Sequence, residues 1–233
     1  MAADGLQYGL NDPDPSVRLQ ATLAVGTRPD ARYVEVLVSQ CADEPDFYVR
    51  EMLTWALVRH SPEVTVPLLL GEVQVGGAQA RSQALHTLSK IGDPRGWSAI
   101  TSELLQDPDD DVARSAWRAA VALVPMERKA GLATTLTTQL GRGDRDVQLS
   151  LGRAFAGLGE AAVGAALAAA ATQSNENVRV HAIATQRVVS DPDEGFDASV
   201  FEAKRMLALM EAPVDVGGEP TTDPFPEFNT DQD

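Results

Sequence analysis

A short segment recurs six times along the chain at nearly constant spacing. Its first copy is Asp14-Pro15-Ser16-Val17-Arg18, in which an acidic residue is followed three positions later by a small aliphatic residue and then by arginine. The aliphatic positions, called anchors below, are Val17, Val49, Ala80, Val112, Val147 and Val178, at intervals of 32, 31, 32, 35 and 31 residues. A fixed period of this size predicts one supersecondary unit stacked on copies of itself.

Each copy predicts a helix that begins at the repeated segment. Apolar residues follow the anchor at positions +4 and +7, as in Val49, Leu53 and Ala56, which is the buried stripe of an amphipathic helix. The Asp or Asn before the anchor stands where a helix N-cap is expected. These second helices of each pair are predicted over 15–26, 46–60, 78–91, 110–124, 144–158 and 176–190.

A first helix precedes most of the second helices, after a proline or glycine boundary. These first helices are predicted over 30–42, 62–74, 94–106, 126–141 and 160–173, with a stub near Gly5–Leu10. Gly26, Gly92 and Gly159 are predicted to end second helices. A last helix near Ala198–Ala212 is predicted to cap the open end of the stack. We therefore expect a helical domain over residues 1–212 and a disordered acidic tail over 213–233.

Composition agrees with a helical array and restricts its partners. Only 5% of the residues are aromatic, and alanine, the best helix former, is abundant. The net charge is −15; the tail holds six acids and no Lys or Arg, so residues 1–212 keep a charge of −9. Because nucleic-acid binders depend on Lys and Arg at phosphates, we expect neither nucleic acid nor an anionic membrane as a partner. The oligomeric state stays open.

The cellular location is predicted from cysteine usage and apolar runs. Cys41 is the single cysteine, which is typical of a reducing compartment and most simply a small core residue. No segment has the pattern of a signal peptide, and the longest apolar run, Ala161–Thr172, is too short to span a bilayer. We expect a soluble cytoplasmic protein.

The period alone also suits tetratricopeptide or ankyrin arrays, but neither signature is present. The segments Leu10–Arg18 and Ala84–Pro94 instead resemble the short HEAT-like repeats named after phycobilin lyase subunits (PBS-lyase-like repeats), with an Asp-Pro turn, Val-Arg, alanines and Gly-Asp-Pro. The resemblance covers about residues 6–190. It implies an all-α fold, a right-handed α-solenoid of about six two-helix repeats, and it leaves the function open because such repeats serve many roles.

The resemblance also implies a ladder of hydrogen bonds between neighbouring repeats, made by the repeated Asp and Arg. Its members would be Asp14, Arg18, Asp46, Arg50, Arg81, Asp109, Asp144 and Arg179. Three copies depart from the pattern, with Gly77 in place of the Asp, and Ala113 and Gln148 in place of the Arg.

No catalytic or metal-binding set is recognisable. The three histidines, His60, His86 and His181, fall in different repeats without metal-ligand spacing. Deoxyhypusine hydroxylase uses this fold with His-Glu dipeptides as iron ligands, and the chain has no such dipeptide. The acidic run Asp107–Asp111 lacks the spacing of a calcium loop. We predict no catalytic residues, no metal and no cofactor.

One surface pattern indicates binding. Position +6 after each anchor holds Leu23, Trp55, His86, Arg118, Arg153 and Ala184, and position +2 holds Leu19, Glu51, Ser82, Arg114, Leu149 and Val180. These positions lie one helical turn apart on one face. If the second helices line the concave surface, Trp55, His86, Arg118 and Arg153 form a row there, beside Glu51, Ser82 and Arg114. The alternative is an ordinary solvated face, with Trp55 packed between repeats; Trp97 and Trp117 are expected in the core.

We therefore expect a noncatalytic scaffold or regulatory module that binds a protein or peptide, with a transcription regulator as one candidate. The stretch Tyr48–His60 loosely resembles HEAT-like proteins that occur alongside transcription regulators. One alternative is a DNA-repair glycosylase of HEAT-like fold, with Trp55 and Glu51 at the lesion; another is a bilin-lyase-like enzyme subunit. In the tail, Phe225 and Phe228 among acids suggest a docking motif, against the simpler reading of a solubilising tail.

Overall fold

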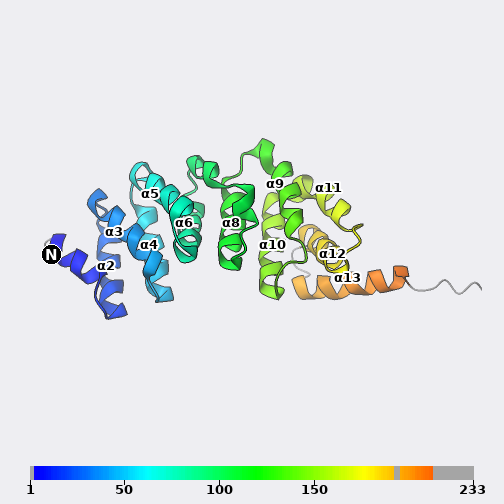
Figure 1. The fold of residues 1–233 in the computed structure, drawn as a ribbon, viewed down its shortest axis with the longest axis horizontal. Coiled ribbons are helices and arrows are strands. Elements are labelled where there is room, and N and C mark those ends of the chain that lie inside the picture. Colours follow the sequence, from blue (N-terminus) through cyan, green and yellow to red (C-terminus); the bar gives the residue numbers. More distant parts are fainter. Residues whose placement is uncertain (1–2, 192–194, 212–233) are drawn as a thin grey trace, which may run out of the picture.

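The computed structural model describes residues 3–191 and 195–211 and shows an elongated stack of helix pairs (Figure 1). The predicted disordered tail, 213–233, lies outside the described residues. The α-helices are α1 (Ala3–Leu10), α2 (Pro15–Thr27), α3 (Val34–Asp43), α4 (Phe47–Arg59), α5 (Pro62–Val75), α6 (Ala78–Ile91), α7 (Ser102–Leu105), α8 (Asp110–Leu123), α9 (Lys129–Leu136), α10 (Arg145–Leu158), α11 (Glu160–Ala170), α12 (Glu176–Ser190) and α13 (Phe196–Glu211). Short 3₁₀ segments are η1 (Ala31–Tyr33), η2 (Pro94–Ala99), η3 (Met126–Arg128) and η4 (Thr137–Gln139).

The helices form two rows along the long axis of the molecule (Figure 1). The second helices α2, α4, α6, α8, α10 and α12 pack side by side in one row, and α3, α5, α9 and α11 lie in the other. The predicted all-α solenoid of stacked helix pairs is confirmed, and the handedness of its superhelix stays a prediction.

The repeated Asp or Asn begins five of the six second helices, as predicted. The side chains of Asp46, Asp109, Asp144 and Asn175 each accept hydrogen bonds from two backbone N–H groups of the first turn, and Asp14 accepts one. Gly77, which replaces the Asp in the third repeat, leaves α6 without a side-chain cap. These caps satisfy N–H groups that a helix cannot pair internally.

The anchors of the inner repeats are buried, and the first anchor is not. Val49 and Val112 are at most 1% exposed, whereas Val17 is 40% exposed. The prediction of a buried stripe was therefore wrong at Val17. The reason is the shortened first repeat, in which the eight-residue α1 stands in place of a full first helix.

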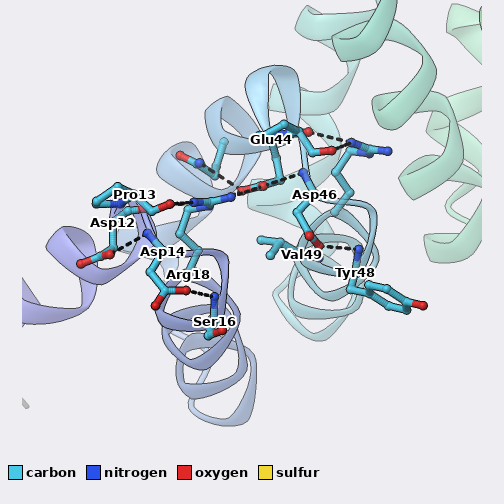
Figure 2. A network of polar contacts seen from close by, with 12 residues as sticks. Asp12, Pro13, Asp14, Ser16, Arg18, Glu44, Asp46, Tyr48 and Val49 are labelled. Atoms are coloured by element: carbon cyan, nitrogen blue, oxygen red, sulfur yellow. Dashed lines mark hydrogen bonds and ion pairs between the residues drawn. The ribbon is translucent and has the colours of Figure 1, made fainter.

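Arginines close the turns that lead into the second helices. The Nη1 atom of Arg18 donates to the carbonyl oxygens of Asp12 and Pro13, at 2.8 and 3.1 Å (Figure 2). Arg50 and Arg179 make the same pair of bonds to the carbonyls six and five residues before them. Each arginine thus satisfies two backbone acceptors that the turn leaves unpaired.

Arg18 also joins its repeat to the next one. Its Nε and Nη2 atoms donate to the two carboxylate oxygens of Glu44, at 2.7 and 2.6 Å, and the Glu44 side chain is fully buried. Burial raises the pKa of Glu44, but the hydrogen bonds from Arg18 and from the Asp46 N–H outweigh burial and lower it. Arg81 contacts Asp107 across the same 26-residue interval, at 2.5 Å.

This pattern corrects the ladder that the resemblance implied. The capping residues Asp14, Asp46, Asp109 and Asp144 bond to their own helices. The carboxylates that link repeats stand two residues before the cap, at Glu44 and Asp107. A cap already engaged by first-turn N–H groups has little freedom to turn toward the neighbouring repeat.

The copies that lack the arginine replace it in two ways. In the fourth repeat Ala113 is fully buried, and Arg142 from the following repeat donates to the carbonyls of Asp107 and Pro108 instead, at 2.6 and 3.2 Å. In the fifth repeat the amide of Gln148 donates to the carbonyl of Gly143 at 3.3 Å.

The prediction of one continuous helix over 94–106 was wrong. This stretch forms the 3₁₀ segment η2 and the single turn α7. Trp117 of α8 is fully buried beneath it and donates its indole N–H to the carbonyl of Leu105, at 2.8 Å. Trp117 is in the core as predicted, whereas Trp97 is only partly buried. Thr101 caps α7 and separates it from η2.

The last helix, α13, covers the end of the second-helix row (Figure 1). It packs on Val180 and Ala184 of α12, which occupy positions +2 and +6 of the sixth repeat, and on Leu149, which occupies +2 of the fifth. Arg145 of α10 and Asp197 of α13 form a bidentate ion pair at 2.7 and 2.6 Å. The predicted capping helix is thus present, on the face that carries the +2 and +6 positions.

The predictions of glycines at helix ends and of a buried cysteine are confirmed in part. Gly92 adopts a left-handed conformation, φ 71°, directly after α6, as predicted for a helix stop. Gly26 lies inside α2, so the predicted stop there was wrong. Cys41 is buried, and burial raises the pKa of its thiol to about 12.

His181 of α12 joins two neighbouring repeats from a buried position. Its Nδ1 atom accepts the N–H of Gly141 at 3.0 Å, and its Nε2 atom lies 3.0 Å from the carbonyl of Gln148. Nδ1 can accept only if the proton is on Nε2, so the ring is neutral. Burial lowers its pKa to about 4, although the Gln148 carbonyl opposes the shift.

This arrangement predicts a pH-dependent stability. The unfolded chain protonates His181 near pH 6.5 and the folded chain only near 4, so stability present above pH 6.5 is lost as pH falls toward 4. Between pH 7 and pH 5 the loss from this residue is about 2 kcal/mol. In the His181→Gln variant, urea unfolding is expected to show a pH dependence weaker by about that amount. An unchanged dependence would contradict the neutral buried ring, and His86→Gln measures the separate contribution of the other histidine with a lowered pKa.

Candidate functional site

Two adjoining pockets lie on the second-helix row. The first, called the His86 pocket, has a volume of about 350 Å³ and is formed by α4, α6 and α8. The second, called the Arg153 pocket, has a volume of about 320 Å³ and is formed by α8 and α10. Arg118 lines both, so the two pockets adjoin at this side chain.

The His86 pocket brings together four of the seven residues predicted from the sequence. They are Glu51, Ser82, His86 and Arg118, which α4, α6 and α8 supply from positions +2 and +6. The Nε2 atom of His86 lies 3.6 Å from the Glu51 carboxylate and has no hydrogen-bond partner among the described residues. Burial lowers the pKa of His86, the Glu51 carboxylate opposes this, and Arg118 adds to it.

The serines of this pocket are engaged with each other. The hydroxyl of Ser82 lies 2.9 Å from that of Ser115 and donates to the carbonyl of Asp111 at 3.2 Å. No hydrogen bond joins Ser82 to His86 within the described residues, so His86 is not placed to activate a serine nucleophile. The arrangement offers hydrogen-bond donors and acceptors to a ligand.

The Arg153 pocket gathers the remaining predicted arginines. Arg114 and Arg118 of α8 and Arg153 of α10 line it, together with Asp146 and Ser150. Partial burial and the charge of Arg114 lower the pKa of Arg118, while Asp111 and Glu51 oppose the shift. The Nε atom of Arg114 is buried and has no hydrogen-bond partner among residues 3–191 and 195–211. This pocket therefore gathers three guanidinium groups beside one lining carboxylate, that of Asp146.

Trp55 is the predicted residue that lines neither pocket. Its indole ring packs against Gly26 of α2, so close that a Cβ atom at Gly26 would lie 2.2 Å from the ring. The guanidinium of Arg59 stacks 5.1 Å from the ring centroid and donates to the Gly26 carbonyl at 2.7 Å. Trp55 thus fills the seam between the first two second helices.

Sequence reasoning missed the aromatic rim of the His86 pocket. Phe47 lines the pocket and is 59% exposed, and it meets the exposed Tyr48 edge-to-face at 5.6 Å. Gln79 lines the pocket from the start of α6. The signal was available in the alignment of the copies: only the second copy has two aromatic residues directly before its anchor. A further hollow, of about 510 Å³, lies at the N-terminal end and includes Leu23.

Neither a metal centre nor a membrane span is found in the part of the chain that the structure describes. No group of three or more His, Cys, Asp or Glu side chains there is placed to hold a metal ion. None of its helices is both long enough and apolar enough to cross a membrane.

Comparison with known proteins identifies the repeat. A family model for HEAT repeats matches residues 3–74. Residues 3–74 are thus similar to HEAT repeats. The helix pairs beyond residue 74 continue the same stacking. No curated protein matches the chain.

Several solved structures are similar in fold. An engineered protein from a structural genomics consortium is 20% identical, with 80% of this chain and 96% of that chain covered and a TM-score of 0.44. A designed armadillo repeat protein is 16% identical (79% and 98% covered, TM-score 0.42), and human deoxyhypusine hydroxylase in complex with glycerol is 17% identical (87% and 94% covered, TM-score 0.44). At these identities and TM-scores the likeness says nothing about function.

The Trp55 seam predicts an unusual response to a glycine substitution. Gly26→Ala is expected to destabilise the protein by about 1–3 kcal/mol, because the new methyl group overlaps the indole ring. The matched control is Gly71→Ala in α5, where nothing lies within 4 Å of the added Cβ atom. There the higher helix propensity of alanine is expected to stabilise by about 0.5–1 kcal/mol. Equal unfolding free energies for the two variants, measured in urea, would contradict the proposed seam.

Proposed function

We propose that this protein is a noncatalytic scaffold or regulatory module that binds a segment of a partner protein across α4, α6, α8 and α10. The observation that carries the proposal is the continuity of the His86 and Arg153 pockets through Arg118. Together they offer a surface that spans four consecutive second helices, which suits an extended or helical peptide better than a small molecule.

The chemistry of this surface supports peptide binding. Arginine and aromatic side chains supply most of the energy at protein interfaces, and here Phe47 stands at one end and Arg118 and Arg153 at the other. The Nε2 atom of His86 and the Nε atom of Arg114 are buried without hydrogen-bond partners among the described residues. The donors that a bound peptide can reach are the exposed guanidinium groups of Arg118 and Arg153.

The enzymatic alternatives have less support. A glycosylase needs an aromatic residue at its lesion pocket, and Trp55 is instead packed between α2 and α4 beneath Arg59. The acidic charge of the chain also opposes binding to nucleic acid. No residue that lines the two pockets supports a bilin-lyase-like subunit. The partner we propose is a protein, and a transcription regulator is one candidate. The location we propose is a reducing compartment such as the cytoplasm, where the buried thiol of Cys41 stays reduced.

A peptide-library selection tests the proposal. The full-length protein is used to select binders from a displayed library of random peptides, and their affinities are then measured for variants. Arg118→Ala and Arg153→Ala are each expected to weaken binding about tenfold or more, since each removes a charge-assisted hydrogen bond. Arg128→Ala, an exposed arginine of η3 outside both pockets, is expected to leave the affinity unchanged.

Two results would contradict the proposed function. One is a library that yields no peptide bound more tightly than an unselected one. The other is a set of selected peptides whose affinities are the same for the wild type, Arg118→Ala and Arg153→Ala. Thermal unfolding of each variant checks that the fold is retained.

A further inference from the structure

The Arg153 pocket has an excess of guanidinium groups that the described residues do not neutralise. Among residues 3–191 and 195–211, Arg118 and Arg153 form no ion pair, and the contact between Arg114 and Asp111 is long, at 3.8 Å. Asp146 is the carboxylate that lines the pocket, and it contacts Arg145 at 3.2 Å. Asp111 and Glu51 also act on Arg118 from the side of the His86 pocket, so the three guanidinium groups have carboxylates nearby but no ion pair shorter than 3.8 Å with the described residues.

Arginines elsewhere in the described part of the chain are of two kinds. Exposed Arg32 and Arg95 and half-buried Arg142 are held closely by carboxylates, as in Arg32–Asp30 at 2.6 Å, Arg95–Asp93 at 2.6 Å and Arg142–Asp110 at 2.7 Å, whereas exposed Arg28 and Arg128 form no ion pair with the described residues. The chain has 34 acidic and 19 basic residues, so unpaired arginines are not forced by a shortage of carboxylates. What distinguishes the Arg153 pocket is that three guanidinium groups are gathered in one hollow, and this arrangement favours an anionic group that comes from outside the described residues.

The last segment of the chain carries such groups. Residues 213–233 contain six acidic residues, Asp215, Glu219, Asp223, Glu227, Asp231 and Asp233, and no Lys or Arg. The net charge of −9 on residues 1–212 repels an acidic partner that approaches through solution. A segment tethered to the same chain overcomes this repulsion, because tethering raises its local concentration to about the millimolar range.

The tether has a suitable length. The segment starts beyond Glu211, the last residue of α13, and α13 begins beside α10, where Asp197 pairs with Arg145. To return to α10, the segment must run back along α13, whose 16 residues extend about 24 Å. Glu227 follows Glu211 by 16 residues, and a chain of that length reaches at most about 53 Å when fully extended, which exceeds the length of α13.

We infer that residues 213–233 bind back into the Arg153 pocket of the same chain and place carboxylates against Arg118 and Arg153. The inference uses the pocket of the proposed function and does not depend on a partner protein. If both hold, the tail competes with the partner for the two arginines and regulates its access.

Zero-length cross-linking of the full-length chain tests the inference. Carbodiimide joins lysine amines to carboxylates that touch them, and the chain has only three lysines, Lys90, Lys129 and Lys204. In Arg153→Lys and, separately, Arg118→Lys, we expect mass spectrometry to find the introduced lysine linked within one chain to a carboxylate of 213–233. Lys129, which begins α9 in the other row of helices, is the internal control and is expected to show at least tenfold less of this link.

The outcomes separate the possible occupants. A link from the new Lys at 153 to Asp146, which lines the same pocket, reports that the amine is reactive. The inference is overturned if that link forms while none to 213–233 does, or if the tail links equally to Lys129. A mixture of isotopically light and heavy chains identifies links between two copies, and links found only between copies also overturn it.

A second measurement separates this inference from the proposed function. Changing the six tail acids to Asn or Gln removes the competitor and leaves both pockets intact, so library peptides are expected to bind at least threefold more tightly. An unchanged peptide affinity would count against docking of the tail. If no peptide is selected and the cross-link forms, the proposed function fails alone; if peptides bind and no cross-link forms, the tail inference fails alone.

Discussion

The structure depends on the pairing of backbone carbonyls in the turns before the second helices. Such a turn leaves carbonyl oxygens that no helix satisfies. In the first, second and sixth repeats an arginine side chain donates to two of them from the first turn of the helix that follows. Where the arginine also reaches a buried carboxylate of the next repeat, as Arg18 reaches Glu44, the same group joins neighbouring repeats. Loss of one partner from a buried ion pair is strongly destabilising. This contact therefore holds the second helices in register.

The register of the second helices creates the polar surface between them. Except at Trp55, which packs into the seam between α2 and α4, positions +2 and +6 of the second to fifth repeats line the two pockets. In the second to fifth repeats they hold seven of the seventeen residues that line the His86 and Arg153 pockets. In the last repeat they are Val180 and Ala184, which α13 covers. The change from polar to apolar residues along this row thus marks where the open surface ends and the capping helix begins.

Helix positions were predictable from the sequence because their causes are local. The 3.6-residue period and the Asp or Asn cap are properties of a single helix, and the predicted and observed second helices agree within two residues at each end. The stretch 94–106 was not predictable in this way, because its conformation depends on packing over the large buried Trp117 of the next helix. The donor that replaces the missing arginine at Ala113 was hidden for the same reason, since Arg142 belongs to another repeat.

The candidate site was predictable in part. The helical period placed Glu51, Ser82, His86 and Arg118 on one face, and the structure brings them into one pocket. The same period put Trp55 on that face, but a large ring also packs sideways into a glycine gap, and the pattern of one helix does not reveal the gap on its neighbour. Phe47 was missed because it precedes the anchor and projects from the start of α4, outside the stripe that periodicity describes.

Exchange of an arginine between two repeats tests the central role of the turn carbonyls most directly. Arg142→Ala is expected to reduce the free energy of unfolding by about 2–3 kcal/mol, because it leaves the carbonyls of Asp107 and Pro108 without their charged donor. Adding Ala113→Arg to that variant returns the arginine to the position it has in other repeats, and we expect it to restore at least half of the loss. Ala113→Arg alone is expected to destabilise, since Ala113 is fully buried and Arg142 already fills the turn. A double variant no more stable than the sum of the two single changes would contradict the account.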